Sequence, residues 1–525
     1  MLAGVSDHAP DCFIADALGQ TLRAETGHTV LVIHFAPVGA RLQAEDWQRL
    51  DLSAGEDQPL GPFLETTESG VAVLHATVPP APEGPFLVRL LRLATRTFQN
   101  VLVHAGSTVP STVVVQSLQL SDRAFLLMQP RGEDFYLRDL LLRDIRRDAP
   151  ECRVQLRTII CRERGEEQSN QLLKQMGPEI HGFIHGCPAA ASSGGVRRCP
   201  DRDFNAGLRR LAREIAHRRV GLALSSGGAR GLAHIGVIQV LEENGIEVDV
   251  VAGCSMGSYI GAVWAYGYDG VAMERLARQI ENRWGLFHLI DPFILPRQGF
   301  LRGEKVKARL KESIGDVHFS ELVRPLRIVA THLASLDRVV FSAGEVARAV
   351  HASSAIPGAC IPIDLDGELY IDGGIADPLP VDVLEEMGIE RIIAINTIPT
   401  PAYLRARIEL EKERDARRGR KTNQVKAFIN RYLNYFAPGN VLDTILRSFN
   451  GAQMQVAEHS CQFADVVLRP LSFDGRWHDF RRPGKYIAIG RRETEQHLDE
   501  VKALVNRKEP TYDSQPAQFS VATAL

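Results

Sequence analysis

Three short turns carry the residues of this chain that could do chemistry. One is a Gly-Cys-Ser-Met-Gly turn around Ser255, the second is the glycine-rich stretch Gly227–Gly231, and the third is an Asp-Gly-Gly turn that begins at Asp372. Acyl transfer requires a nucleophilic hydroxyl, a base that takes its proton and donors that stabilise an oxyanion. Ser255 could supply the hydroxyl, Asp372 the carboxylate base and the stretch Gly227–Gly231 the backbone N–H groups.

Ser255 lies between a predicted strand and a predicted helix. The strand, Val248–Ala252, is a continuous apolar run, and the helix, Ser258–Ala265, is rich in small residues. Such a turn holds a serine in a strained conformation, and Gly253 and Gly257 let the two backbones pass closely. The hydroxyl would then lie at a helix N-terminus, where the dipole favours developing negative charge.

The upstream glycines follow a predicted strand, Val220–Leu224, and precede a helical pattern at Ala233–Leu241. We expect the backbone N–H groups of this strand-loop-helix junction to be free to bind an oxyanion. The expected oxyanion residues are Gly227, Gly228, Ala229 and Arg230. The Arg230 side chain could add a charge or brace the loop. Glycine loops before helices also bind phosphate, but the Gly-Lys-Ser/Thr ending of a Walker-type site does not follow.

The acidic turn follows a short predicted strand, Glu368–Ile371, and Gly373 and Gly374 permit close backbone approach beside it. Alone, an Asp-Gly-Gly sequence is usually an ordinary turn. Together with Ser255, it leads us to interpret Asp372 as the base.

Several histidines are alternative candidates for chemistry. His459, His478 and His497 follow Asp372 in the chain order of a Ser-Asp-His triad. His478 lies in a loop-like segment and His497 on the apparent terminal helix, so neither follows a strand end, and surface histidines are the better interpretation. His234 lies among apolar neighbours on a helix, and we interpret it as a packed or bracing residue.

The sequence blocks described above resemble those of a known family. Residues 220 to about 398 resemble the patatin-like phospholipases, and within them the bacterial and neuropathy-target-esterase-like branch. The three turns and a fourth block, Ala352–Gly358, occur in family order and spacing. The resemblance implies a three-layer α/β hydrolase domain, a Ser255–Asp372 dyad without metal or cofactor, and hydrolysis of phospholipid or lysophospholipid acyl esters. His351 departs from the arginine common in relatives, which puts only local bracing in doubt.

Composition narrows the class of protein. The 61 basic and 64 acidic residues nearly cancel, so we expect no nucleic acid partner. Eight cysteines without Cys-x-x-Cys pairs indicate reduced thiols and a cytoplasmic setting. Asp7 and Asp11 argue against a signal peptide, and no apolar run approaches the roughly 18 residues of a membrane span. Peripheral contact with the inner membrane surface stays open, as does the oligomeric state.

We expect an accessory domain at 1–195, the hydrolase domain at 196–507 with an inserted helical segment near 401–460, and a disordered tail at 508–525. Five short apolar strands alternate with helix-length segments in the first part, which predicts a smaller Rossmann-like α/β domain with a parallel sheet. These strands are Val30–Ile33, Val71–Leu74, Val101–His104, Ala124–Met128 and Leu156–Ile160.

The accessory domain distantly resembles partition-type ATPases around residues 15–33 and 121–125. It lacks a preceding Walker A loop, and His104 stands where a magnesium-linked acid is expected. We therefore interpret it as a degenerate, regulatory module.

An amphipathic pattern at residues 421–436, with basic residues beside it, is typical of an interfacial helix. A helix packed on the hydrolase core gives the same pattern, and we favour that interpretation. Two other functions compete with lipid hydrolysis: a lipid-binding regulatory protein in which catalysis is dispensable, and a general carboxylesterase.

Overall fold

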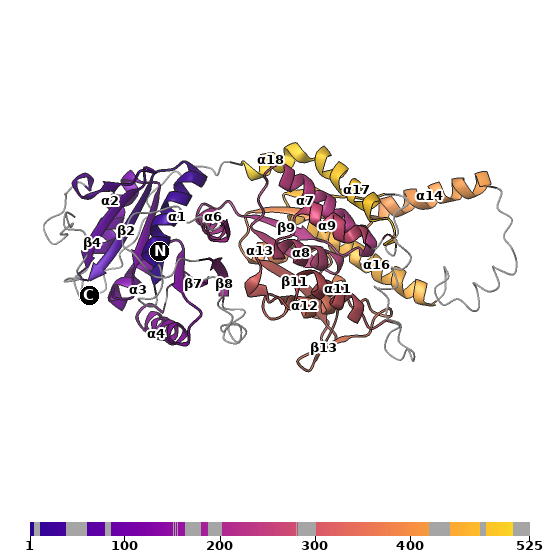
Figure 1. The fold of residues 1–525 in the computed structure, drawn as a ribbon, viewed down its shortest axis with the longest axis horizontal. Coiled ribbons are helices and arrows are strands. Elements are labelled where there is room, and N and C mark those ends of the chain that lie inside the picture. Colours follow the sequence, from indigo (N-terminus) through magenta and orange to yellow (C-terminus); the bar gives the residue numbers. More distant parts are fainter. Residues whose placement is uncertain are drawn as a thin grey trace.

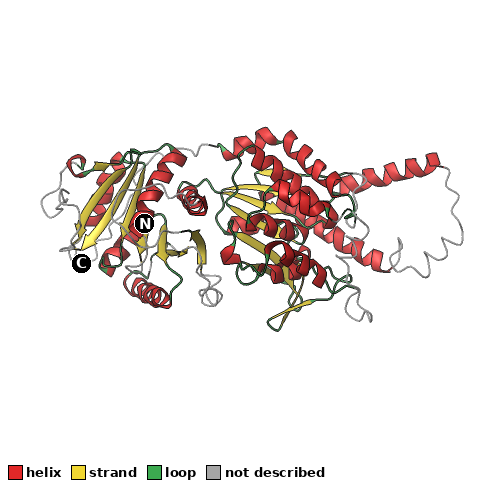
Figure 2. Cartoon of the chain, viewed as in Figure 1, coloured by secondary structure: helices red, strands yellow, loops and turns green. Residues whose placement is uncertain are grey.

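The computed structural model describes the chain apart from residues 5–10, 38–59, 79–85, 163–179, 187–201, 282–300, 419–440, 473–478 and 508–525 and the single positions 151, 153, 155 and 280. Two eight-stranded sheets lie one after the other along the described chain, each with helices beside it (Figures 1 and 2). The amphipathic pattern at 421–436 and the expected tail at 508–525 fall outside the described residues.

The first sheet has the strand order β3-β4-β2-β5-β1-β6-β7-β8. Its strands are β1 (Leu2–Gly4), β2 (Val30–Pro37), β3 (Glu65–Thr66), β4 (Ala72–Val78), β5 (Asn100–Ala105), β6 (Ala124–Met128), β7 (Leu156–Arg162) and β8 (Ile180–His185). Only the short β3 pairs antiparallel within this described sheet. The predicted parallel α/β sheet is therefore confirmed, and the five predicted strands correspond to β2, β4, β5, β6 and β7.

Helices surround this sheet, and one of them comes from beyond the expected domain boundary. The helices are α1 (Asp11–Thr26), α2 (Phe86–Thr97), α3 (Ser111–Gln119), α4 (Gly132–Asp148) and α6 (Arg202–Ile215), with the 3₁₀ turn η1 (Gly61–Phe63). On α6, Phe204 and Leu208 are buried in one cluster with Ile14 and Leu18 of α1. Helix α6 therefore packs on the first sheet, although we expected it to open the hydrolase domain. The boundary at residue 195 stays a prediction.

A buried carboxylate near the end of α6 joins the two sheets. Glu214 accepts hydrogen bonds from His181 of β8 at 2.9 Å and from Arg219, just before the second sheet, at 3.2 Å. Arg157 of β7 bonds to the same carboxylate. Burial would raise the pKa of Glu214, but His181 and the two arginines lower it to about 2. The carboxylate is thus charged and holds cationic partners from both sides.

The second sheet has the order β13-β14-β11-β10-β9-β15-β16, with β12 paired to β11. Its strands are β9 (Val220–Leu224), β10 (Val250–Cys254), β11 (Leu326–His332), β12 (Arg338–Phe341), β13 (Ile363–Leu365), β14 (Glu368–Asp372), β15 (Arg391–Ile395) and β16 (Val466–Leu468). The neighbouring strands β11, β10, β9, β15 and β16 pair in parallel. Strands β12 and β14 pair antiparallel with β11, and β13 pairs antiparallel with β14. The parallel centre is the part that positions the candidate site.

Both faces of this sheet are covered, because neighbouring strand residues point to different cores. Leu222 belongs to one buried cluster and Ala223 to another. The helices are α7 (Ala233–Glu243), α8 (Met256–Tyr266), α9 (Gly270–Arg278), α11 (Glu304–Ile314), α12 (Val346–Ser353), α13 (Val381–Glu386), α14 (Pro401–Arg418), α16 (Val441–Ser460), α17 (Pro483–Gln496) and α18 (Leu498–Val505). Helices therefore lie on either side of the sheet, as in the expected three-layer α/β domain. None of the described helices is long and apolar enough to cross a membrane.

We call the first sheet with its helices the first unit, and the second sheet with its helices the second unit. Short 3₁₀ turns complete the second unit: η3 (Gly228–Leu232), η4 (Phe319–Glu321), η5 (Gly373–Ile375) and η6 (Cys461–Phe463). The segment expected as an insertion near 401–460 contains α14 and α16. Helix α14 extends away from the sheet (Figure 1). Helix α16 instead contributes Met454 and Ala457 to the buried cluster that contains Ala223. Part of this segment is therefore core.

Helices α7 and α17 pack backbone to backbone through two glycines. A Cβ on Gly236 of α7 would clash with the Ile487 carbonyl oxygen, and a Cβ on Gly490 of α17 would clash with the Ala233 carbonyl oxygen. The clashing atoms belong to the main chain and cannot rotate away. One whole helix would have to move to admit a side chain.

We expect Gly490→Ala to lower the free energy of unfolding by about 1–3 kcal/mol, because overpacking displaces α17. Gly451→Ala on α16 is the matched control, since its Cβ would have no atom within 4 Å. The control should be neutral or slightly stabilising, because alanine favours helix. Urea denaturation measures both variants, and equal effects would contradict the close packing.

Candidate active site

Ser255 occupies the turn between β10 and α8 in a strained conformation. Its φ is 52° and its ψ is −118°, a region that non-glycine residues rarely adopt. A Cβ on Gly257 would clash with the Leu224 carbonyl oxygen of β9, and one on Gly253 would lie 2.7 Å from the Gly257 carbonyl. Close backbone approach therefore leaves no room for a side chain at either flanking glycine.

The Ser255 hydroxyl donates a hydrogen bond to Asp372. The distance from Oγ to Oδ2 is 2.7 Å, and the backbone N–H of Gly374 donates to the other carboxylate oxygen, also at 2.7 Å. Ser255 is 7% exposed and Asp372 is 1% exposed. Burial raises the pKa of Asp372 to about 6, against the opposing effect of the two hydrogen bonds. The structure thus brings together a hydroxyl and a carboxylate that are 117 residues apart in the sequence.

Two neighbouring hydroxyl groups fix the backbones of this pair. Ser353, at the end of α12, accepts a hydrogen bond from the Ser255 N–H at 2.8 Å and donates one to the Val329 carbonyl at 2.6 Å. Thr331 of β11 donates to the Asp372 carbonyl at 3.1 Å. Ser353 lies in the fourth sequence block, Ala352–Gly358. Its two hydrogen bonds connect the serine turn to β11, which explains why this block contains a serine.

The glycine-rich stretch is a 3₁₀ helix rather than the open loop that we expected. Gly228 and Ala229 lie in its first turn, where backbone N–H groups have no partner within the helix. The Arg230 N–H instead donates to the Gly227 carbonyl at 3.3 Å, and its guanidinium Nε lies 3.5 Å from the same oxygen. The Arg230 N–H is therefore engaged within the turn, and the Arg230 side chain braces the loop.

Gly227 also has a packing role. A Cβ at this position would clash with the Thr397 hydroxyl, which donates to the Ser226 carbonyl at 2.9 Å. This hydroxyl links the glycine turn to the chain that follows β15. Gly228 has a φ of 56°, in the left-handed region that favours glycine. The two glycines thus set the path of the first turn of η3.

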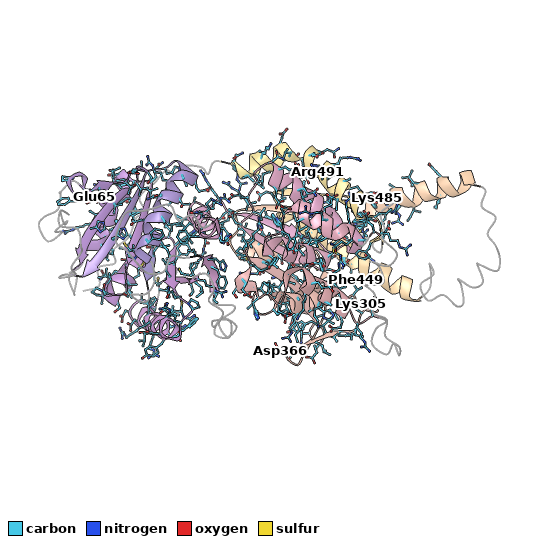
Figure 3. The ribbon with its side chains drawn as sticks, in the orientation of Figure 1. Glu65, Lys305, Asp366, Phe449, Lys485 and Arg491 are labelled. Carbon is cyan, nitrogen blue, oxygen red and sulfur yellow. The ribbon has the colours of Figure 1, made fainter. Side chains whose placement is uncertain are left out.

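An open pocket lies at the serine and the carboxylate, with about 400 Å³ of empty space that includes open solvent. Its lining residues are Ser226, Gly227, Gly228, Arg230, Ser255, Ile356, Asp372, Phe449, Asn450 and Gln453. The last three come from α16, whose Phe449 is labelled in Figure 3. Gln453 is buried so close to the acidic turn that a Cβ on Gly374 would clash with its amide nitrogen. Sequence analysis missed these residues, because a helical i, i+1, i+4 spacing without a motif gives no chemical signal.

His234 and His351, the two buried histidines among the described residues of the second unit, act as bracing groups. His234 Nε2 donates to the Ser225 carbonyl at 3.0 Å, and burial lowers its pKa to about 4, so the ring is neutral at pH 7. This agrees with the interpretation of His234 as a packed residue. His351 Nε2 donates to the Arg302 carbonyl at 3.1 Å.

The candidate triad histidines do not join the carboxylate in the part of the chain that the structure describes. His459 is exposed on α16 and packs edge-on against Phe463. His497 follows α17, and its Nδ1 donates to the Glu493 carbonyl at 2.9 Å. His478 lies outside the described residues. Among the described histidines, cysteines and acids, one group is arranged as a metal site would be, and it lies in the first unit.

Residues 222–385 match the family model of patatin-like phospholipases. An uncharacterized NTE family protein of Mycobacterium tuberculosis is 42% identical over 179 residues, which is 34% of this chain and 49% of that protein. The "Lysophospholipase nte1" of Aspergillus fumigatus is 34% identical over 194 residues, or 37% of this chain and 13% of that protein. The chain thus spans about half the length of the first relative and less of the second. These matches confirm the resemblance inferred from the sequence.

Among solved structures, that of a ParA family ATPase from Chlorobium tepidum is similar to this one with a TM-score of 0.26 and 14% sequence identity. The similarity covers 41% of this chain and 91% of that chain.

The raised pKa of Asp372 predicts how the free energy of unfolding depends on pH. Between the ordinary carboxyl pKa of 3.8 and about 6, the folded state binds the proton more tightly than the unfolded state. This carboxyl therefore makes the fold less stable as pH rises, by roughly 2–3 kcal/mol in all. Asp372→Asn cannot titrate, so its stability relative to wild type should increase from pH 4 to pH 7.

Urea denaturation at several pH values measures this difference. Asp364→Asn, at an exposed position on β13, controls for the removal of a carboxylate. A difference between Asp372→Asn and wild type that stays constant with pH would contradict the raised pKa.

Proposed function

We propose that the second unit is a serine acyl hydrolase that cleaves acyl esters of phospholipids or lysophospholipids. The observation that carries this proposal is the 2.7 Å hydrogen bond from the strained Ser255 to the buried Asp372 at the floor of a cavity. The match to patatin-like phospholipases over residues 222–385 and the lysophospholipase name of a relative support the substrate class.

The chemistry follows from this pair. Asp372 takes the proton of Ser255 as Oγ attacks the acyl carbonyl, and a tetrahedral intermediate forms. The proton then passes to the leaving alcohol, which departs and leaves an acyl-serine. In the second half, Asp372 takes a proton from water, the hydroxide attacks the acyl-serine, and the proton returns to Ser255 as the fatty acid leaves.

The intermediate carries negative charge on the former carbonyl oxygen. We assign the N–H groups of Gly228 and Ala229 as its donors, because they begin η3 and have no partner within that helix. The N-terminus of α8 starts next to Ser255 and adds a favourable dipole.

A carboxylate can serve here as the base because of its burial. A pKa near 6 makes Asp372 more basic than an ordinary aspartate, yet leaves it mostly ionised at pH 7. A histidine is then not needed between the two groups.

The cavity also has features that suit a phospholipid. Phe449 and Ile356 provide apolar surface for an acyl chain, and Arg230 provides a cation for a phosphate. Burial lowers the pKa of Arg230 to about 10, which still leaves the guanidinium charged at neutral pH. These groups favour a lipid ester over a small neutral ester, the substrate of a general carboxylesterase.

The remaining assignments are also proposals. We assign a regulatory role to the accessory unit at 1–195, and a cytoplasmic location with peripheral contact at the inner membrane surface. In the competing lipid-binding function, the serine and carboxylate would be dispensable.

Ser255→Ala should lower kcat by about 10⁴-fold or more, because the acyl-serine cannot form. Released fatty acid is measured by mass spectrometry on a panel of phospholipids and lysophospholipids. A fluorophosphonate probe should label wild type and the control Ser335→Ala, whose serine is exposed beyond β11, but not Ser255→Ala. Wild-type turnover by a folded Ser255→Ala protein would overturn the assignment of Ser255 as nucleophile, whereas lipid binding without turnover by the wild type would favour the regulatory alternative.

Asp372→Asn should be nearly inactive, because the amide cannot accept the serine proton. In wild type, kcat/KM should rise about tenfold per pH unit below about 6 and level off above it, because only the ionised carboxylate acts as a base. Single alanine substitutions of His459, His478 and His497 should keep most activity and the same pH profile. Loss of activity in any one of them, comparable with Asp372→Asn, would indicate a triad.

A further inference from the structure

A cluster of nitrogen and sulfur groups lies on the first sheet, away from the candidate active site. His34 of β2 and His104 of β5 are register partners on adjacent parallel strands, and His75 of β4 is the partner of His34 on its other side. Cys12 and Asp16 lie one turn apart on α1 and complete the cluster. In open α/β sheets, ligands bind where strands give way to helix N-termini, and Cys12 is the second residue of its helix.

Two of the spacings between the ligand atoms are close to those around a single tetrahedral ion. His34 Nδ1 lies 3.0 Å from His104 Nδ1 and 3.6 Å from Cys12 Sγ, and the three ligand atoms are all within 4.8 Å of one another. For zinc, bond lengths of 2.0–2.1 Å to nitrogen and 2.3 Å to sulfur give tetrahedral edges of about 3.3 Å between nitrogens and about 3.6 Å between nitrogen and sulfur. The Nδ1 atoms of His34 and His104 would have to move slightly further apart to accommodate the ion.

Asp16 sets the tautomer of His34. The carboxylate only accepts hydrogen bonds, so the 2.8 Å contact between His34 Nε2 and Asp16 Oδ1 places the proton on Nε2. The lone pair of His34 Nδ1 then points at His104 and Cys12. A carboxylate behind the imidazole is the usual outer partner of a metal-bound histidine, and it increases the basicity of the ligand.

Burial and charge also suit a cation. His34 is 4% exposed and His104 is 5% exposed, so both rings are held in place, whereas Cys12 is exposed and leaves a path for entry. The His75 ring stacks on His34 with centroids 5.0 Å apart. The Asp16 carboxylate, 2.8 Å from His34 Nε2, supplies negative charge beside a bound ion.

We propose that the first unit binds one divalent transition-metal ion of the zinc type through Cys12 Sγ, His34 Nδ1 and His104 Nδ1, with Asp16 as outer partner and the fourth position open to water. Binding requires Cys12 to release its proton to solvent as the metal–thiolate bond forms. It also requires the His104 proton to reside on Nε2, so that both Nδ1 lone pairs face the ion. Imidazole and thiolate select zinc, cobalt or nickel over magnesium.

The experiment uses the full chain, freed of metal with a chelator and titrated with Co²⁺ and Zn²⁺. Co²⁺ should bind at one ion per chain with a thiolate-to-metal charge-transfer band, and Zn²⁺ should displace it. Calorimetry gives the affinity. Cys12→Ser should remove the charge-transfer band and weaken binding at least about tenfold, and Asp16→Asn should weaken it by about 10–100-fold with the band retained.

Cys152→Ser is the matched control, a cysteine of the same unit outside the cluster, and should bind as wild type does. Cys12 is exposed, so its serine variant should fold, which thermal melting and unchanged esterase activity would verify. Three results would overturn the proposal: no Co²⁺ or Zn²⁺ binding at micromolar concentration, an unchanged charge-transfer band in Cys12→Ser, or unchanged affinity in His34→Ala and His104→Ala.

Discussion

The second unit depends on keeping one carboxylate charged in its interior. Asp372 is almost fully buried, and among the described groups that shift its pKa none is a cation. Within the described part of the chain, its charge is stabilised by hydrogen bonds from the Gly374 N–H and the Ser255 hydroxyl. Both donors must be placed accurately, because a buried charge without partners is costly. The antiparallel pairing of β14 with β11 fixes one partner, and the strained turn after β10 fixes the other.

The parts of this arrangement that are local in sequence could be predicted from it. Glycines and apolar runs located the Ser255 turn and the strand that leads to Asp372, because close backbone approach and continuous burial restrict residue type. The side chains of α16 that line the cavity were not predictable, since they approach only through tertiary packing. Strand β1 has three residues, too few to show a period, although it pairs with β5 and β6 inside the first sheet.

Assigning α6 to the first sheet also required the structure. The hydrophobic positions of α6 would suit a helix that packs on either sheet. The burial of Phe204 in one cluster with residues of α1 shows that α6 packs on the first sheet. Near its end the same helix carries Glu214, which bonds to β7, β8 and the residue before β9. The two units therefore share a buried ionic contact, and their chemistries differ: a hydroxyl and a carboxylate in one, imidazoles and a thiol in the other.

The glycine contact between α7 and α17 has a consequence for protein synthesis. Gly236 emerges from the ribosome long before Gly490, its counterpart across the helix pair. At about 5–20 residues per second, translation of the intervening chain lasts roughly ten to fifty seconds. Throughout this interval, the surface of α7 that α17 will cover faces solvent in the nascent chain. A chaperone that acts on the nascent chain during this interval would find that surface of α7 uncovered.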